Sequence, residues 1–358
     1  MIEDTFVQSL YLHNFRNFEQ TSVHFSPELN VIYGNNAQGK TNLLEALYFF
    51  SMGRSFRTAH LQELIREGAS SFFLEIQFIK DGIQQRISAQ FDGISKKLVY
   101  NHTKYSSFTP LIGILPSVLY APSDYSLIMG SPAERRRFFD LHLAQIDPLY
   151  VHHAIRYHKA VKQRNVLLKK RSTSLLFPWE EIMSHSAAYL MKERQKTISE
   201  FEELLLKNML YLSEEKDSLS MQYEPSFQGV LTDELLQELK KSQKKEMLQG
   251  SSLLGPHKDE FQILINHKKA KSYASEGQKR CSLAALRIAQ WDNLKKKTKA
   301  APFMMIDDFT IHLDQKRTQL FQSLLPRLGQ VFVTSPSLLS LSLNQKEIYV
   351  EKGRIIHY

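Results

Sequence analysis

The stretch that decides the fold reads Val31-Ile32-Tyr33-Gly34-Asn35-Asn36-Ala37-Gln38-Gly39-Lys40-Thr41. A short apolar run of buried-strand type is followed by G-x-x-x-x-G-K-[ST], the pattern of a phosphate-binding loop that opens a helix. Its glycines let successive backbone N–H groups face one anion, Lys40 reaches the β- and γ-phosphates, and the Thr41 hydroxyl is placed to bind Mg²⁺. We expect every residue from Gly34 to Thr41 to bind a nucleoside triphosphate. The alternative is a glycine-rich turn with an exposed lysine.

A second nucleotide motif lies in the C-terminal third. Residues 303–306 are apolar, which is typical of a short buried strand. Asp307 and Asp308 follow them directly, and this combination has the form of a Walker B strand. Asp307 would hold Mg²⁺, as the Walker B aspartate does in P-loop enzymes. Asp308 stands where ABC-type ATPases place the acid that polarises the attacking water. An ordinary strand end capped by acidic residues is the alternative for this segment read alone.

The third motif, Ser275-Glu276-Gly277-Gln278, precedes the Walker B strand by about one helix. A serine hydroxyl and a glycine N–H at a helix start offer donors to a γ-phosphate, which is the chemistry of an ABC signature loop. We expect Ser275 and Gly277 to stabilise the γ-phosphate and Gln278 to contact the nucleotide. By itself the motif is a weak match, since it also fits a plain helix N-cap. The helix that follows carries an apolar stripe at Cys281, Ala284, Ile288 and Trp291.

The three motifs together predict an ATP-dependent homodimer. In ABC-type ATPases the signature loop closes over ATP held by the phosphate loop of a partner, so two protomers enclose two ATP molecules. A higher affinity of ATP for the closed dimer would couple binding to a change in shape.

Composition limits the function classes. The chain has 358 residues, one cysteine, and 46 Lys and Arg against 37 Asp and Glu, for a formal charge of +9. The single cysteine excludes an intramolecular disulfide, and its place on the apolar stripe predicts core packing. No run approaches 18 apolar residues, so we expect a cytoplasmic protein without a membrane partner. The charge favours a polyanionic partner, or else lysine-rich solvated helix faces.

A change of pattern divides the chain. Alternating strand-like runs such as residues 73–79 dominate up to about residue 110, helical periodicity dominates from 131 to 245, and strand signals return from residue 260. We therefore predict an α/β fold: an ABC-type head of residues 1–130 and 246–358, with an antiparallel β subdomain, interrupted by a helical arm of residues 131–245. A capping box at Ser131-Pro132-Ala133-Glu134 predicts a helix start. Residues 180–215 have the spacing of a helical hairpin arm, and residues 348–356 that of a final hairpin.

Five ordered blocks resemble the RecF recombination-mediator family essentially from end to end. They are residues 12–18 (LHNFRNF), 53–57 (GRSFR), 130–140 (GSPAERRRFFD), 162–165 (KQRN) and 255–261 (GPHKDEF). The resemblance implies a bacterial ABC-type ATPase related to the structural-maintenance-of-chromosomes proteins but without their long coiled coils. It also implies that Arg16, in the first block, lies against the nucleotide.

The resemblance further implies a role in DNA replication, recombination and repair, including the SOS response. Such proteins bind DNA when ATP-bound, hydrolyse ATP weakly in a DNA-dependent manner, and work with RecR and RecO to help load RecA at single-strand gaps. Two departures from the family pattern bear on ATP-driven closure. Residues 311–314 read Ile-His-Leu-Asp where the family usually has Ser-Glu-Leu-Asp, and Glu276 adds a negative charge to the signature loop.

Basic clusters are the candidates for DNA contacts. Arg135, Arg136 and Arg137 lie in the first turns of a predicted helix, where the helix dipole disfavours cations, so phosphates or internal carboxylates must compensate. Lys162 and Arg164 lie on the next helix and could follow a DNA backbone without reading its sequence. The alternative for each cluster is a solvated helix face.

Two rival functions remain open at this stage. One is another ABC-type head, such as a transporter ATPase. The other is a DNA-binding scaffold in which ATP is structural and hydrolysis is slight.

Overall fold

The computed structural model describes residues 5–229, 232–308, 315–339 and 344–356. The chain forms two compact units. The first comprises Met1–Asp124, Asn208–Lys216 and Glu276–Tyr358, and the second comprises Tyr125–Lys207 and Asp217–Ser275. One long helix, α5 (Leu176–Ser213), contributes residues to both units.

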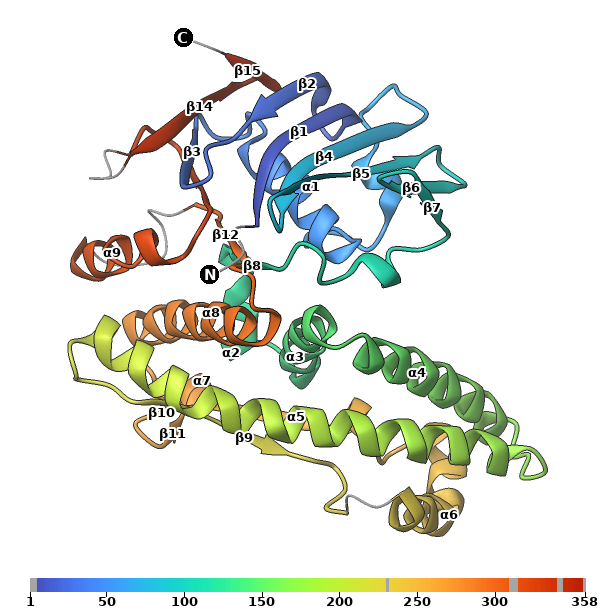
Figure 1. Ribbon diagram of the computed structural model, residues 1–358. Helices are drawn as coiled ribbons and strands as arrows, with labels where there is room; N and C mark the ends of the chain where they lie inside the picture. The colour runs from blue at the N-terminus through green and yellow to red at the C-terminus, as the bar shows by residue number, and fades with distance from the viewer. Residues whose placement is uncertain (1–4, 230–231, 309–314, 340–343, 357–358) are drawn as a thin grey trace. The chain divides into compact units, whose positions relative to one another are not determined.

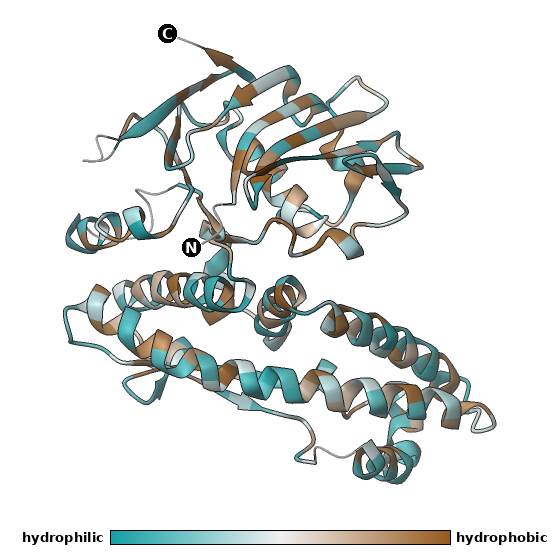
Figure 2. Ribbon diagram, viewed as in Figure 1, coloured by the Kyte–Doolittle hydropathy of each residue, from teal (hydrophilic) through white to brown (hydrophobic). Residues whose placement is uncertain are grey.

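The first unit contains an antiparallel sheet in the order β2-β1-β4-β5-β6-β7 (Figure 1). Its strands are β1 (Phe6–Phe15), β2 (Phe18–His24), β4 (Phe72–Lys80), β5 (Ile83–Phe91), β6 (Lys96–Tyr100) and β7 (Thr103–Tyr105). Buried and less buried residues alternate along β4, which appears as alternating brown and teal bands in Figure 2. One face of this sheet is therefore packed against the core, as the alternating sequence predicts.

The second sheet of the first unit has the order β15-β14-β3-β13-β12-β8. Its strands are β3 (Leu29–Tyr33), β8 (Ser117–Tyr120), β12 (Phe303–Ile306), β13 (Val331–Ser335), β14 (Gln345–Glu351) and β15 (Arg354–Ile356). All pairings in this sheet are parallel except that of β15 with β14. The strands β8, β12 and β13 are buried along their whole length, which fits their mainly apolar sequences.

The first unit also contains helices α1 (Lys40–Met52), α8 (Glu276–Thr298) and α9 (Gln315–Gln322), the end of α5 and short 3₁₀ turns. The predicted stripe on α8 is confirmed, because Cys281, Ala284, Ile288 and Trp291 are all buried. The combination of a mixed, mainly parallel sheet and an antiparallel sheet agrees with the α/β head predicted from the sequence.

The second unit is mainly helical. Its helices are α2 (Tyr125–Met129), α3 (Pro132–Ile146), α4 (Pro148–Lys169), most of α5, α6 (Thr232–Gln249) and α7 (Ala270–Tyr273). Helices α4, α5 and α6 share one apolar core, in which Tyr157, Ala187 and Leu239 are fully buried. None of the helices in the described residues is both long enough and apolar enough to cross a membrane.

The second unit also contains a sheet that the predicted boundaries at residues 131 and 245 do not accommodate. Strand β9 (Leu219–Glu224) lies inside the predicted helical arm and pairs antiparallel with β10 (Glu260–Ile265), which in turn pairs with β11 (Lys268–Lys269). The segment predicted as a helical insertion therefore contains one strand, and the second unit begins at Tyr125 and extends to Ser275. The alternation of Leu219, Met221 and Tyr223 with polar residues was the available signal.

Helix α3 begins at Pro132 as predicted, but the capping box does not form. The side chain of Ser131 makes no capping hydrogen bond, and only its carbonyl oxygen accepts one, from the N–H of Glu134. The following helix is better capped, because the carboxylate of Asp147 accepts a hydrogen bond from the N–H of Leu149 at 2.9 Å.

Candidate nucleotide site

The phosphate loop connects β3 to α1, and close approaches require both of its glycines. Gly34 has φ +146°, and a Cβ there would lie 2.2 Å from the carbonyl oxygen of Val350. Gly39 has φ +118°, and a Cβ there would lie 2.7 Å from Oδ1 of Asn17. Larger residues would push the loop away from both neighbours, so the glycine spacing read from the sequence has a steric cause.

Lys40 lies at the first position of α1 and is 6% exposed. Its Nζ donates hydrogen bonds to the carbonyl oxygens of Gly34 at 2.6 Å and Asn35 at 2.8 Å. Burial lowers the pKa of Lys40, and the nearby carboxylates of Asp308 and Asp307 oppose that shift. The ammonium group is thus held inside the loop and close to two negative charges.

The carboxyl ends of β12 and β13 bring the Walker B residues to the start of α1. Oδ1 of Asp307 accepts hydrogen bonds from the hydroxyl groups of Thr41 at 2.9 Å and Thr334 at 2.8 Å. The Thr334 hydroxyl also accepts a hydrogen bond from the N–H of Asp308 at 2.8 Å. Asp308 has φ +59°, a conformation that non-glycine residues rarely adopt. Sequence reasoning placed Thr41 and Asp307 at this site but did not predict the hydrogen bonds that Thr334 makes with Asp307 and Asp308.

This oxygen-rich corner fits Mg²⁺. The hydroxyl of Thr41 and the carboxylate of Asp307 are hard oxygen donors at hydrogen-bond distance from each other. Among the described residues, no group of three or more His, Cys, Asp and Glu side chains could hold a metal ion. Mg²⁺ commonly takes one or two protein ligands and completes its shell with water and substrate phosphates. The residues therefore suit a cation that arrives with a nucleotide.

Arg16 is bound inside the first unit. Its Nε and Nη2 donate to the two oxygens of the buried Glu45 at 2.8 and 2.6 Å, and its Nη1 donates to the carbonyl oxygen of Glu63 at 2.8 Å. Glu45 also accepts a hydrogen bond from Ser55 and lies 3.6 Å from Arg57. Two of the ordered blocks therefore bind the same carboxylate, that of Glu45: the first through Arg16 and the second through Ser55 and Arg57. Nucleotide contact by Arg16 stays a prediction.

The signature motif begins α8. Glu276 pairs with Lys279 at 3.0 Å, one turn along the helix, so its negative charge has a local cation. A Cβ at Gly277 would lie 2.8 Å from Nη1 of Arg317, the end of a flexible side chain that can move aside. Ser275 is exposed. The loop at residues 311–314 lies outside the described residues.

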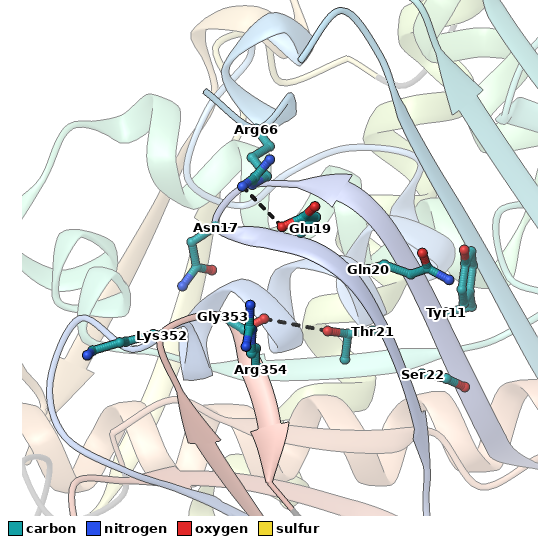
Figure 3. A pocket seen from close by; sticks show the side chains of 10 residues that line it. All are labelled: Tyr11, Asn17, Glu19, Gln20, Thr21, Ser22, Arg66, Lys352, Gly353 and Arg354. Atoms are coloured by element: carbon teal, nitrogen blue, oxygen red, sulfur yellow. Dashed lines mark hydrogen bonds and ion pairs between the residues drawn. The ribbon is translucent and has the colours of Figure 1, made fainter. Parts of the chain in front are cut away.

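A polar pocket of about 610 Å³ opens beside the phosphate loop. Figure 3 shows its lining side chains, including the ion pair of Arg66 with Glu19 and the contact of Thr21 with Gly353. The lining residues are Tyr11, Asn17, Glu19, Gln20, Thr21, Ser22, Arg66, Lys352, Gly353 and Arg354.

Comparison with known proteins identifies the family. Residues 6–335 match the family model described as an AAA ATPase domain. The chain is 42% identical over 335 residues to the DNA replication and repair protein RecF of Protochlamydia amoebophila, covering 92% of this chain and 93% of that protein. It is 40% identical over 346 residues to the RecF of Chlamydia caviae, covering 95% and 94%. The chain belongs to the RecF family.

Solved structures agree with this RecF assignment. The structure of the recombination mediator protein RecF-ATP in the RecFOR pathway matches with a TM-score of 0.91 and 28% identity, covering 99% of this chain and 97% of that one. An Smc head bound to the C-terminal winged-helix domain of ScpA matches with a TM-score of 0.59 and 15% identity over 98% of this chain and 97% of that one. This second likeness concerns the fold alone. The predicted ABC-type head and the RecF resemblance are thereby confirmed, which makes the chain an ATPase-domain protein of DNA replication and repair.

The basic residues of the RecF-like blocks do not all face solvent. Arg135 donates to both oxygens of Glu260 at 2.8 and 3.0 Å, and Arg136 donates to the carbonyl oxygen of Asp259 at 2.7 Å. An internal carboxylate therefore compensates Arg135, which was the alternative left open by the sequence, while Arg136 is bound to a backbone carbonyl. Arg137 is exposed.

Arg164 was predicted as a DNA contact, and this is wrong. Its side chain is fully buried and binds the buried carboxylates of Glu180 at 2.9 Å and Glu246 at 2.5 Å, with Ser252 at 2.9 Å. Lys162 is exposed on the same helix. Two helical positions are about 200° apart around the axis, so Lys162 and Arg164 point to opposite faces. The RecF-like block at residues 162–165 therefore includes a core ion-pair residue.

Proposed function

We propose that this chain is an ATP-dependent DNA-binding protein whose ATP-induced homodimer closes on DNA during replication and recombinational repair. The observation that carries the proposal is the convergence of Lys40, Thr41 and Asp307, with Thr334 orienting the carboxylate. This arrangement supports binding of a triphosphate with its cation at the start of α1.

In the proposed reaction each residue has a distinct role. Thr41 and Asp307 hold Mg²⁺, which neutralises phosphate charge when it is bound. Lys40 exchanges its two loop carbonyls for phosphate oxygens and stabilises the charge that develops there. Asp308, next to Asp307, orients the attacking water.

The partner protomer completes the proposed site. Ser275 and Gly277 of one protomer donate to the γ-phosphate held by the other, and Gln278 contacts the nucleotide. The pairing of Glu276 with Lys279 supports this arrangement, because it offsets a negative charge beside the phosphate. A Ser275→Arg variant should lose ATP-dependent dimerisation in analytical ultracentrifugation. ATP-driven dimers at wild-type strength in that variant would sink this part of the proposal.

The DNA target and partners follow from the family. We infer that the protein acts in the cytoplasm on the nucleoid, at single-strand gaps beside duplex, with RecR and, through it, RecO and RecA. The solved relative named as a recombination mediator of the RecFOR pathway supports this inference. Exposed Arg137 and Lys162 are the remaining candidates for phosphate contacts among the predicted residues. We expect weak ATP hydrolysis that DNA stimulates.

One experiment tests the central proposal. Fluorescence anisotropy of labelled gapped duplex DNA is measured with Mg-ATP, with ADP and without nucleotide, for the wild type and Lys40→Met. Tight, salt-sensitive binding with ATP alone, lost in Lys40→Met, is the expected result. Binding that ignores the nucleotide would favour a scaffold with structural ATP, and no DNA binding in any state would reopen the choice of another ABC-type head.

A further inference from the structure

The turn between the last two strands is hydrogen-bonded to the phosphate loop. The N–H of Lys352 donates to Oε1 of Gln38 at 2.7 Å, and the N–H of Gly353 donates to the carbonyl oxygen of Gln38 at 3.0 Å. Gln38 immediately precedes the second glycine of the loop. Residues more than 300 positions apart in the chain therefore meet at the loop that would bind phosphate.

A second turn holds the same residue. Nδ2 of Asn17, between β1 and β2, donates to the carbonyl oxygen of Gln38 at 2.8 Å. Oδ1 of Asn17 accepts a hydrogen bond from Nδ2 of Asn42, in the first turn of α1, at 2.8 Å. The carbonyl of Gln38 thus accepts two hydrogen bonds, which direct it towards the two turns. Because the peptide bond is trans, the N–H of Gly39 points the opposite way.

At two positions in this region, backbone atoms approach so closely that a side chain has no space. Gly353 has φ +71°, and a Cβ there would lie 2.1 Å from the carbonyl oxygen of Asn17. On the preceding strand, the carbonyl oxygen of Val350 would lie only 2.2 Å from a Cβ added at Gly34. The final hairpin therefore packs backbone to backbone against both ends of the loop. Figure 3 shows Asn17, Lys352 and Gly353 together at the wall of the pocket.

We propose that the β14–β15 turn is a positioning element for the nucleotide site, acting through Gln38, Asn17 and Gly353. It holds the phosphate loop in its curled form before the nucleotide arrives, so that binding does not have to order the loop. The inference rests on the proposed function, since it concerns the affinity of the same site for triphosphate. By linkage, a bound nucleotide must in return stabilise the turn.

A matched pair of glycine variants tests the proposal. Gly353→Ala places a Cβ against Asn17, whereas Gly82→Ala, in the β4–β5 turn, has nearly the same φ, +72°, and nothing within 4 Å of the new Cβ. Both variants place an alanine at a positive φ, but only Gly353→Ala adds a close contact beside the loop. Affinity for a fluorescent ATP analogue and the midpoint of thermal unfolding are measured for both.

The two variants should both lose thermal stability but should differ in their affinity for nucleotide. Both variants should unfold at a somewhat lower temperature, and only Gly353→Ala should bind nucleotide about ten-fold more weakly, the loss of roughly one hydrogen bond. Equal affinities in Gly353→Ala, Gly82→Ala and the wild type would overturn the inference while leaving the proposed function intact. A wild type that binds no nucleotide would overturn both.

A side-chain variant keeps the test decisive if Gly353→Ala does not fold. Gln38→Met preserves length but removes the acceptor for the N–H of Lys352 and the donor to the carbonyl oxygen of Asn36. It should weaken ATP binding less than Gly353→Ala does. Amide hydrogen exchange gives a further measurement, because ATP would not change exchange in the turn if the turn were only structural. ATP should slow exchange of the Lys352 and Gly353 amides in the wild type and not in Lys40→Met. Unchanged exchange in the ATP-bound wild type would contradict the proposed coupling.

Discussion

The hydroxyl group of Thr334 donates a hydrogen bond to Oδ1 of Asp307 at 2.8 Å. The same oxygen of Thr334 accepts from the N–H of Asp308 at 2.8 Å, so one side chain at the end of β13 orients both acidic residues that follow β12. A threonine here costs little rotamer freedom, because its β-branched side chain is already restricted in the strand.

Replacing Thr334 with Val keeps the shape of the side chain and removes both hydrogen bonds. We expect the Mg²⁺ concentration needed for half-maximal ATP binding to rise about ten-fold or more, as for other residues that orient metal ligands. Thr334→Ser keeps the hydroxyl and should stay close to the wild type. The measurement is a Mg²⁺ titration of nucleotide binding, and equal midpoints for all three proteins would contradict this role.

The ion-pair cluster around Arg164 predicts a stability defect in place of a DNA-binding one. Arg164→Met leaves the buried carboxylates of Glu180 and Glu246 without their cation, which should destabilise the protein by about 3–5 kcal/mol. Lys162→Met, on the exposed face of the same helix, should change stability by less than about 0.5 kcal/mol. Urea unfolding followed by circular dichroism measures both, and similar midpoints for the two variants would refute the core role of Arg164.

His257 predicts a loss of stability in mild acid. Nδ1 lies 2.5 Å from the hydroxyl of the buried Tyr157, and Nε2 lies 3.1 Å from the carbonyl oxygen of Ser252, so both nitrogens are engaged in the neutral form. Burial lowers the pKa of His257 from 6.5 to about 4. His257 is therefore protonated below pH 6.5 in the unfolded chain but only below about pH 4 in the folded chain. The stabilisation is complete above pH 6.5 and is lost as the pH falls towards 4.

Between pH 7 and pH 5 this group should reduce the free energy of unfolding by about 2 kcal/mol. His257→Gln can keep both hydrogen bonds without titrating, so its stability should fall less over the same range. Parallel pH profiles of the two proteins, measured by denaturant unfolding, would show that His257 is not responsible.

Exposed Arg137 and Lys162 predict small, sequence-independent effects on DNA binding. If each contacts one phosphate, Arg137→Ala and Lys162→Ala should each reduce the slope of log affinity against log salt by about 1. Lys104→Ala, at an exposed position on β7, is the control and should leave the slope unchanged. Variants whose slopes match that of the control would exclude these two residues from the DNA path.

Much of the fold follows from local sequence. The strand, loop and helix around Lys40 and the alternation of β4 depend on residues within a few positions of one another, where backbone sterics and burial period dominate. The same holds for the apolar stripe of α8, whose four positions are all buried. The Walker B strand could also be recognised because a continuous apolar run suits a strand covered on both faces.

Contacts between distant segments could not be read in this way. The pairing of β9 with β10 joins residues about forty positions apart, and its register is set by which faces can be buried together. A basic side chain in the middle of a helix carries no local sign of whether it faces solvent or two buried carboxylates, so Arg164 read like a surface cation. For Arg135, the helix dipole left phosphates and internal carboxylates as alternatives.

The sequence by itself determined that this chain has a phosphate loop, a Walker B strand and the block order of the RecF family, because those features are written in consecutive residues. Only the tertiary structure decided which side chains orient them. Thr334 meets Asp307, and Gly353 meets Gln38, because neighbouring strands of one sheet bring remote segments within hydrogen-bond distance. That proximity comes from sheet pairing and core packing, which no local pattern encodes.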